Sequence, residues 1–254
     1  MADVIALAGK GGTGKTTIAG LVVRALVGGG RTPVLAVDAD PNACLDVALG
    51  LFPDKAVSDV LHSSRGLRDV SETTPKQTYL EYELENCVAE GRGVDLLEMG
   101  RPEGPACYCS ANNLLRIYMD RLMGSYRTVV TDNEAGMEHL SRRTTREVDL
   151  LLIVSDPSQV GIRAAARIRD LVAELKLPVR RIALIVNRAS VLPPSVEAAI
   201  EAADLELVGL VPDDPLVPEF ELSGRPLLEL PDDALAAQAV GRILANLRGG
   251  GLPA

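Results

Sequence analysis

The sequence predicts an α/β protein with a doubly wound, mostly parallel β-sheet flanked by helices. Short apolar runs rich in β-branched residues alternate along the chain with longer segments of helical periodicity. The 254 residues suit one large domain, and 47% hydrophobic residues suffice for a sizeable core. We therefore expect a single domain over residues 1–248, followed by a flexible tail over 249–254.

The expected elements follow in chain order. Residues 4–8 form a short apolar run that predicts a fully buried strand, and a helix is expected from Gly14 to Val27. Three consecutive glycines at 28–30 end that helix. Residues 52–93 are polar and interrupted, which predicts short helices in a mobile or partner-facing region. Other strands are expected over 33–37, 94–99, 127–131, 149–154, 181–186 and 205–211, and other helices over 112–123, 159–175 and 233–247.

Composition and charge exclude several classes of function. The net charge of −9 opposes non-specific binding to nucleic-acid phosphates, and the absence of Trp argues against stacking on single strands. No apolar run is long enough to span a membrane, and the N-terminus resembles no signal peptide. Four cysteines are too few for a disulfide-built fold. We expect a cytoplasmic protein with reduced thiols that binds neither nucleic acid nor membrane.

The most specific motif is a phosphate-binding loop between the first predicted strand and helix. Residues 9–17 read G-K-G-G-T-G-K-T-T and fit G-x-x-x-x-G-K-[ST]. Backbone N–H groups of such a loop surround a phosphate, and the following helix N-terminus adds its dipole. Lys15 is expected to reach the β- and γ-phosphates and Thr16 to bind Mg²⁺. The remaining expected nucleotide contacts of this loop are Gly11, Gly12, Thr13, Gly14 and Thr17.

Lys10 adds a second lysine to this loop. The pattern K-G-G-x-G-K-T-T resembles the deviant Walker A family, which includes the partition, septum-positioning, arsenite-pump and nitrogenase-iron-protein ATPases. The resemblance implies a P-loop NTPase fold of the MinD and iron-protein type. It also implies that Lys10 crosses a homodimer interface to the partner's nucleotide, where a second ammonium neutralises transition-state charge.

Two further strand ends carry carboxylates. Asp38 and Asp40 close the strand over 33–37, and Asp132 ends the strand over 127–131, as a Walker B carboxylate does. The first pair resembles the family's first switch, by which Asp40 would orient or deprotonate the attacking water and Asp38 would lie near Mg²⁺. Asp132 would hold Mg²⁺, and Gly136 fits the second switch, D-x-x-x-G.

Two later strand ends are expected to frame the base. An Asn-Lys/Arg pair and a Pro-x-Asp segment surround adenine in the resembled family, and this resemblance favours ATP over GTP. The matching residues here are Asn187, Arg188, Pro212, Asp213 and Asp214.

Cys107 and Cys109 lie one residue apart, just before a predicted helix whose dipole favours thiolates. Soft thiolates suit Ni, Zn, Cu(I) or an iron–sulfur cluster. One pair supplies two ligands, and a two-fold dimer would assemble four. We interpret Cys44 and Cys87 as structural.

A deviant Walker A loop, the C-Y-C segment and A-G-M-E-H-L at 135–140 together resemble the CooC-type maturation factors. These are nickel-inserting accessory ATPases of carbon monoxide dehydrogenase and its acetyl-CoA synthase partner. The resemblance implies Ni²⁺ or Zn²⁺ bound by Cys107 and Cys109 between two subunits, with nucleotide promoting dimerisation. Residues 133–134 are Asn-Glu, a departure from the familiar dehydrogenase factors that makes an acetyl-CoA synthase client plausible.

Two alternatives stay open. An iron–sulfur redox ATPase would use the same kind of dimer, although no Cys follows Asp132 as the iron-protein pattern requires. A partition or septum-positioning ATPase would need a basic face or a basic amphipathic tail. The last helix carries only Arg242 and Arg248 as basic residues.

Overall fold

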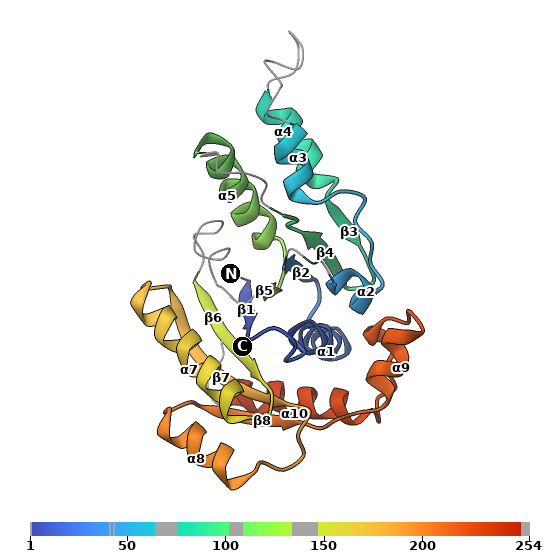
Figure 1. Cartoon of the computed structure of the whole chain (residues 1–254). Coiled ribbons are helices and arrows are strands. Elements are labelled where there is room, and N and C mark those ends of the chain that lie inside the picture. The colour runs from blue at the N-terminus through green and yellow to red at the C-terminus, as the bar shows by residue number, and fades with distance from the viewer. Residues whose placement is uncertain are drawn as a thin grey trace.

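The computed structural model describes residues 2–40, 42, 44–63, 76–101, 109–133 and 147–249. They form an α/β domain in which an eight-stranded sheet is covered by helices on both faces (Figure 1). The strands are β1 (Asp3–Ala8), β2 (Val34–Ala39), β3 (Val88–Glu90), β4 (Val94–Glu98), β5 (Thr128–Asn133), β6 (Val148–Ser155), β7 (Val179–Asn187) and β8 (Leu207–Val211). The helices are α1 (Lys15–Gly28), α2 (Leu45–Leu49), α3 (Val57–Ser63), α4 (Lys76–Glu85), α5 (Cys109–Gly124), α7 (Gln159–Glu174), α8 (Pro194–Ala202), α9 (Leu216–Leu222), the 3₁₀ turn η2 (Leu227–Glu229) and α10 (Leu235–Gly249).

The strand order across the sheet is β3-β4-β2-β5-β1-β6-β7-β8. Every described pair is parallel except β3 with β4. The chain leaves β1 toward β2 on one side and later returns to β6 on the other, so the order reverses at β1. Ligands of doubly wound sheets bind beyond the carboxyl ends of the strands at such a reversal. This topology places the segment after β1 at the expected ligand site.

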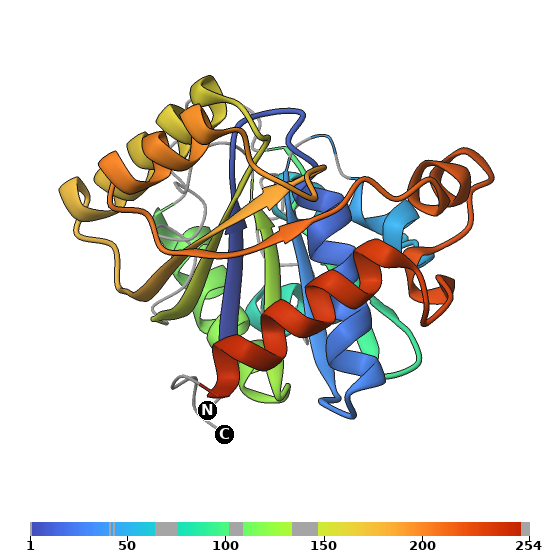
Figure 2. The same ribbon diagram turned by 90° about the horizontal axis from the view of Figure 1, so that it is seen from below.

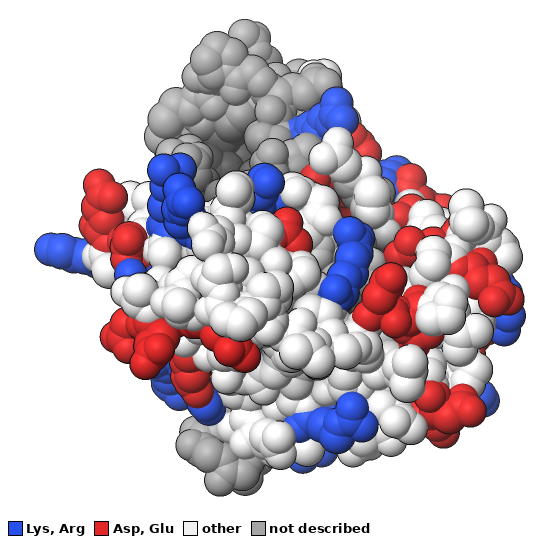
Figure 3. Space-filling view, turned by 60° about the horizontal axis from the view of Figure 1, so that its bottom comes forward, with Lys and Arg blue, Asp and Glu red and all other residues white. Residues whose placement is uncertain are grey.

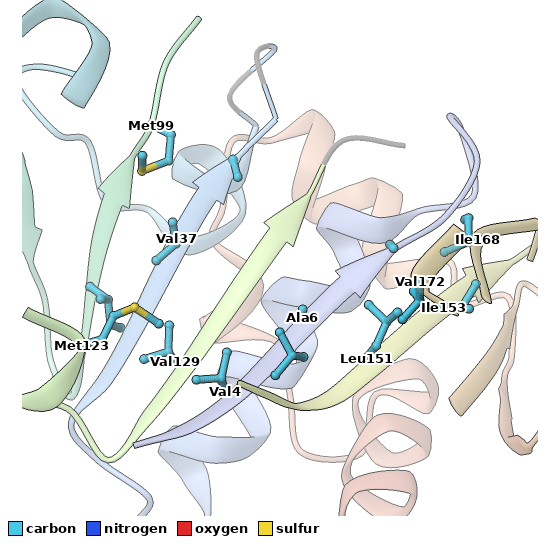
Figure 4. Packing of buried hydrophobic residues seen from close by; sticks show 14 of the residues in the cluster. Val4, Ala6, Val37, Met99, Met123, Val129, Leu151, Ile153, Ile168 and Val172 are labelled. Carbon is cyan, nitrogen blue, oxygen red and sulfur yellow. The ribbon is translucent and has the colours of Figure 1, made fainter. Parts of the chain in front are cut away.

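Alternate residues of the central strands supply two separate cores. Val4 and Ala6 of β1 enter the core beneath α3, α4, α5, α7 and α8, where Met123 and Ile168 pack (Figure 4). Ile5 and Leu7 enter the core on the opposite face, beneath α1, α2, η2 and α10 (Figure 2). Strands buried on both faces read as continuous apolar runs, which is why they were visible in the sequence.

The predicted elements agree with the structure to within a few residues. The glycine stop after α1 is confirmed, since Gly29 caps the helix and Gly30 adopts φ 68°. The region over 52–93 contains the expected short helices α3 and α4, and also the antiparallel edge strand β3. The predicted helix over 112–123 begins three residues earlier, at Cys109. Helices α8 and α9 and the turn η2 were not predicted.

Helix α10 runs to Gly249, one residue into the expected tail, and residues 250–254 lie outside the described part of the chain. Among the described residues, every helix is too short or too polar to cross a lipid bilayer.

Candidate functional site

The phosphate loop connects β1 to α1 at the carboxyl edge of the sheet. Gly14 caps α1 in the left-handed region, with φ 86°. A Cβ on Gly14 would lie 2.4 Å from Nδ2 of Asn187, and one on Gly9 would lie 2.3 Å from the Val154 carbonyl oxygen. Both positions therefore require glycine. Gly11 and Gly12, at the exposed tip, have nothing within 4 Å of a built Cβ, so the tip leaves room for a ligand.

The two lysines of the loop have different environments. Lys15 opens α1 and is 8% exposed, whereas Lys10 is exposed. The Lys10 carbonyl accepts hydrogen bonds from Thr13, at 3.4 Å from its backbone N and 2.9 Å from its Oγ1. These bonds fold the loop tip and leave the Lys10 ammonium at the surface. The prediction that Lys10 reaches a partner's nucleotide fits this exposure and stays a prediction.

Thr16 and Asp132 bring α1 and β5 together. The Thr16 hydroxyl donates to Oδ2 of Asp132 at 2.6 Å. Asp132 is 1% exposed, and its Oδ1 has no hydrogen-bond partner. Burial raises the pKa of Asp132 to about 7, with the neighbouring Asp38 adding to the rise and Thr16 opposing it. A buried carboxylate oxygen without a partner is costly unless a cation or proton joins it.

This pair fits Mg²⁺. Mg²⁺ prefers oxygen ligands and is held in proteins by one or two carboxylates together with hydroxyls and phosphate oxygens. Thr16 and Asp132 supply a hydroxyl and a carboxylate oxygen beside the phosphate loop. The residues predicted for Mg²⁺ thus include two that the structure brings into direct contact.

The first switch lies at the end of β2. Asp38 is the Cα partner of Asp132 across β2 and β5, so the two carboxylates stand side by side. Asp40 is partly exposed, and its Oδ1 accepts from the backbone N and Nδ2 of Asn42, both at 2.9 Å. Oδ2 of Asp40 takes part in neither bond. The structure therefore places the predicted water-orienting carboxylate at the edge of the site.

The residues predicted to frame adenine are partly engaged within the chain. Nδ2 of Asn187 donates to the Thr13 carbonyl oxygen at 2.9 Å, which ties β7 to the phosphate loop. Arg188 adopts φ 57° and directs Nη1 toward the Gly12 carbonyl oxygen at 3.4 Å. Both residues thus lie against the loop, and their contact with the base stays a prediction.

Asp214 serves as an anchor between two helices. It is 4% exposed, and its two oxygens accept from the backbone N of Leu216 at 3.0 Å and of Ala236 at 2.9 Å. This carboxylate therefore joins the start of α9 to the first turn of α10. Pro212 is partly exposed and Asp213 is exposed, so these two residues are more accessible to solvent than Asp214.

Sequence reasoning missed two acidic residues. Glu98 ends β4 as the Cα partner of Asp38, and burial raises its pKa to about 7, with Asp46 the next cause. Glu221 on α9 accepts from the Thr17 hydroxyl at 3.0 Å. Glu98 ends an apolar strand, as Asp38 and Asp132 do, and that pattern could have identified it. Nothing local marks Glu221, because 204 residues separate it from Thr17.

The four cysteines divide into two groups. Cys87 is buried, in agreement with a structural role, and burial raises its pKa to about 12. Cys44, which we interpreted as structural, has an exposed side chain. Cys107 lies outside the described residues, as does the side chain of Cys109 at the start of α5. The predicted Gly136 also lies outside them.

Across the described residues, no cluster of three or more His, Cys, Asp or Glu side chains could hold a metal ion.

On the face shown in Figure 3, acidic side chains gather on two flanks of a broad uncharged area, and basic side chains are scattered.

Comparison with known proteins identifies the family. Residues 4–227 match the family model described as the CobQ/CobB/MinD/ParA nucleotide binding domain. An uncharacterized ATP-binding protein of Methanocaldococcus jannaschii is 38% identical over 237 residues, which cover 91% of this chain and 92% of that protein. The carbon monoxide dehydrogenase accessory protein CooC of Rhodospirillum rubrum is 33% identical over 234 residues, which cover 87% of each chain.

Solved structures share the fold. A ParA family ATPase from Chlorobium tepidum aligns with a TM-score of 0.74 and 22% identity over 97% of this chain and 98% of its own. MinD of Pyrococcus horikoshii, solved with Mg-ADP, aligns with a TM-score of 0.68 and 22% identity over 97% and 96% of the two chains. The predicted doubly wound fold and the resemblance to MinD- and ParA-type ATPases are thereby confirmed. The chain belongs to the CobQ/CobB/MinD/ParA family of P-loop nucleotide-binding proteins.

Proposed function

We propose that this protein is a homodimeric, Mg²⁺-dependent ATPase that assists nickel insertion into carbon monoxide dehydrogenase or acetyl-CoA synthase. One observation carries the ATPase assignment. The Thr16 hydroxyl and the buried Asp132 carboxylate meet beside a phosphate loop, and one Asp132 oxygen is left for a cation. The CooC relative supports the nickel assignment.

The phosphate loop would bind the triphosphate through its backbone N–H groups and the N-terminus of α1. Thr16 and Asp132 would hold Mg²⁺, which when bound neutralises phosphate charge and orients the β- and γ-phosphates. Lys15 would contact these phosphates, and its position at the start of α1 supports this role. Lys10 of one protomer would reach the partner's nucleotide and compensate charge that develops during transfer.

Asp40 would orient the attacking water and accept its proton. The water oxygen forms the new bond to the γ-phosphorus while the bond to the β-phosphate oxygen breaks, which yields ADP and phosphate. The Asn42 bonds to Oδ1 hold the Asp40 carboxylate, and Oδ2, which takes no part in them, would accept from the water. Asn187, Arg188, Pro212 and Asp213 would border the adenine, with Asp214 anchoring their segment.

Cys107 and Cys109 would bind the cargo Ni²⁺, or Zn²⁺ in its place, with the same pair from the second protomer. Four thiolates complete the coordination that one chain lacks. Because α5 begins at Cys109, the helix dipole would favour the thiolate form of this residue. Closing of the dimer around ATP would assemble the metal site, and hydrolysis would loosen it for delivery to the client enzyme.

An anaerobic Ni²⁺ titration of the reduced protein tests this function, with the Cys107→Ser/Cys109→Ser double variant as the control. Thiolate-to-metal charge-transfer absorbance should saturate near one Ni²⁺ per two chains and vanish in the double variant. Protein that carries iron and labile sulfide would instead indicate the redox alternative. Protein that binds no metal, while ATP hydrolysis persists, would overturn the nickel assignment and leave a positioning ATPase as the remaining class.

A further inference from the structure

Asp38 is buried and accepts hydrogen bonds from backbone N–H groups of residues that follow it in the chain. It ends β2 and is 1% exposed. Its Oδ1 accepts from the backbone N of Asp40 at 3.0 Å. Its Oδ2 accepts from the backbone N of Cys44 at 3.0 Å and of Leu45 at 2.9 Å. One carboxylate therefore binds three backbone N–H groups that span the segment from Asp40 to Leu45.

These bonds hold the backbone of Asp40 close to the end of β2. Hydrogen bonds from N–H groups to a buried carboxylate are charge-assisted and stronger than neutral ones. The Cys44 and Leu45 N–H groups belong to the start of α2, so Asp38 fixes both ends of the segment to the end of β2. Burial raises the pKa of Asp38, and the three N–H bonds oppose that rise by favouring the carboxylate.

Asp38 and Asp132 differ in what they can still bind. They are neighbours in the sheet and equally buried. Both oxygens of Asp38 already accept backbone N–H groups, whereas Oδ1 of Asp132 has no partner. Of these two carboxylates, Asp132 is the one with an oxygen that has no hydrogen-bond partner, so it gains more from a cation.

The main chain of Asp38 extends the connection to β4. The Met99 backbone N donates to the Asp38 carbonyl oxygen at 2.8 Å, directly after Glu98 ends that strand. In the sequence, the segment that follows Met99 leads to Cys107 and Cys109. Asp38 thus joins the first switch to the strand from which the cysteine segment departs.

We propose that Asp38 is a positioning residue that holds the first switch, and with it Asp40, in the hydrolytic arrangement, and that it does not bind Mg²⁺ directly. This inference rests on the proposed role of Asp40 in hydrolysis. In this role Asp38 positions Asp40 through hydrogen bonds to the backbone and makes no direct bond to Mg²⁺.

The first test compares Asp38→Asn with Asp132→Asn. Asparagine keeps the size of Asp38 but places a donor against at least one of the three N–H groups. We expect kcat to fall by about tenfold or more in D38N, while the Mg²⁺ concentration needed for half-maximal ATP binding changes by less than about twofold. D132N should raise that Mg²⁺ concentration by about tenfold or more. An equal rise in D38N would overturn the proposal.

The second test needs neither nucleotide nor metal. Amide hydrogen exchange of the Cys44 and Leu45 N–H groups, followed by NMR, reports directly on their bonds to Oδ2 of Asp38. If Asp38 holds the segment, D38N should accelerate the exchange of these two N–H groups by about tenfold. Asp40→Asn removes a nearby negative charge without removing the three bonds, and should accelerate their exchange by less than about threefold.

Equal acceleration in D38N and D40N would contradict the proposal. Asp38→Ser, which retains one acceptor, serves as the second variant if thermal unfolding shows that D38N does not fold. If the wild-type protein hydrolyses no ATP, the proposed function fails, and the exchange rates of the Cys44 and Leu45 N–H groups still decide whether Asp38 holds the switch.

Discussion

The Thr16 hydroxyl donates to Oδ2 of Asp132 at 2.6 Å, which joins the first turn of α1 to the end of β5. The Thr16 hydroxyl, at the start of α1, and the buried Asp132 carboxylate, at the end of β5, therefore lie next to each other. We predict that Thr16→Val, which keeps the shape of the side chain but lacks the hydroxyl, raises the Mg²⁺ requirement of ATP binding by about tenfold. Titration of Mg²⁺ at fixed fluorescent nucleotide measures this change.

Thr16→Ser is the matched control for that prediction, because serine restores the hydroxyl. It should return the Mg²⁺ requirement to within about threefold of the wild type. A valine variant with an unchanged Mg²⁺ requirement would show that Thr16 only braces Asp132.

Asp40→Ala should abolish ATP hydrolysis and preserve ATP binding, since its carboxylate lies at the edge of the site and outside the phosphate loop. Release of phosphate and binding of ATP, measured on the same preparation, separate the two effects. Loss of ATP binding together with hydrolysis would be inconsistent with a role in orienting water.

Glu221 faces the Thr17 hydroxyl at the N-terminal turn of α1, where nucleotide phosphates are expected. A carboxylate there repels a phosphate, so Glu221→Gln should tighten ADP binding by about two- to fivefold at low salt. The gain should shrink at high salt, because exposed charges are screened. Calorimetry at two salt concentrations measures it.

Glu219→Gln is the control for Glu221, because it removes an equivalent charge from α9 at an exposed residue. It should leave ADP affinity within about twofold of the wild type. Weaker ADP binding in Glu221→Gln would mean that Glu221 contributes a favourable contact to the nucleotide.

Glu98 predicts a pH dependence of stability. Its pKa of about 7 in the folded protein lies above the ordinary 4.5, chiefly because of burial. A carboxylate with a raised pKa stabilises the fold fully below its unfolded pKa, and that contribution is lost as pH rises through about 7. After allowance for solvent screening, the effect is about 1 kcal/mol, or roughly 2–4 °C in Tm.

Thermal unfolding of the wild type and of Glu98→Gln between pH 5 and 8 checks this sign. The wild type should lose stability relative to Glu98→Gln as pH rises across this range. Parallel Tm curves for the two proteins would show that Glu98 is solvated and titrates normally.

The elements that could be predicted from the sequence are those marked by a pattern within a few neighbouring residues. Strands buried on both faces, such as Val148–Ser155, are continuous apolar runs, and the phosphate loop carries its own spacing. Asp38, Asp40 and Asp132 were found because each follows such a run. Helix α9 was missed because it is only seven residues long and carries Pro218 in its first turn, so its sequence resembles a loop.

Contacts between distant segments account for the rest. The Glu221–Thr17 bond, the Asn187–Thr13 bond and the Asp214–Ala236 bond each join residues far apart in the chain. The sequence also does not reveal the different hydrogen bonding of Asp38 and Asp132, because both are carboxylates at strand ends. Asp38 accepts three backbone N–H groups from the segment that follows it, whereas one oxygen of Asp132 has no partner.

In the proposed function, the nucleotide state of the dimer controls its metal site. The most direct measurement is the Ni²⁺ affinity of the Asp40→Ala variant, titrated anaerobically with and without Mg-ATP, because this variant should hold ATP unhydrolysed. We expect one Ni²⁺ per two chains and a Ni²⁺ affinity at least about tenfold higher with ATP. The same Ni²⁺ affinity with and without ATP, in protein that demonstrably binds both, would contradict it.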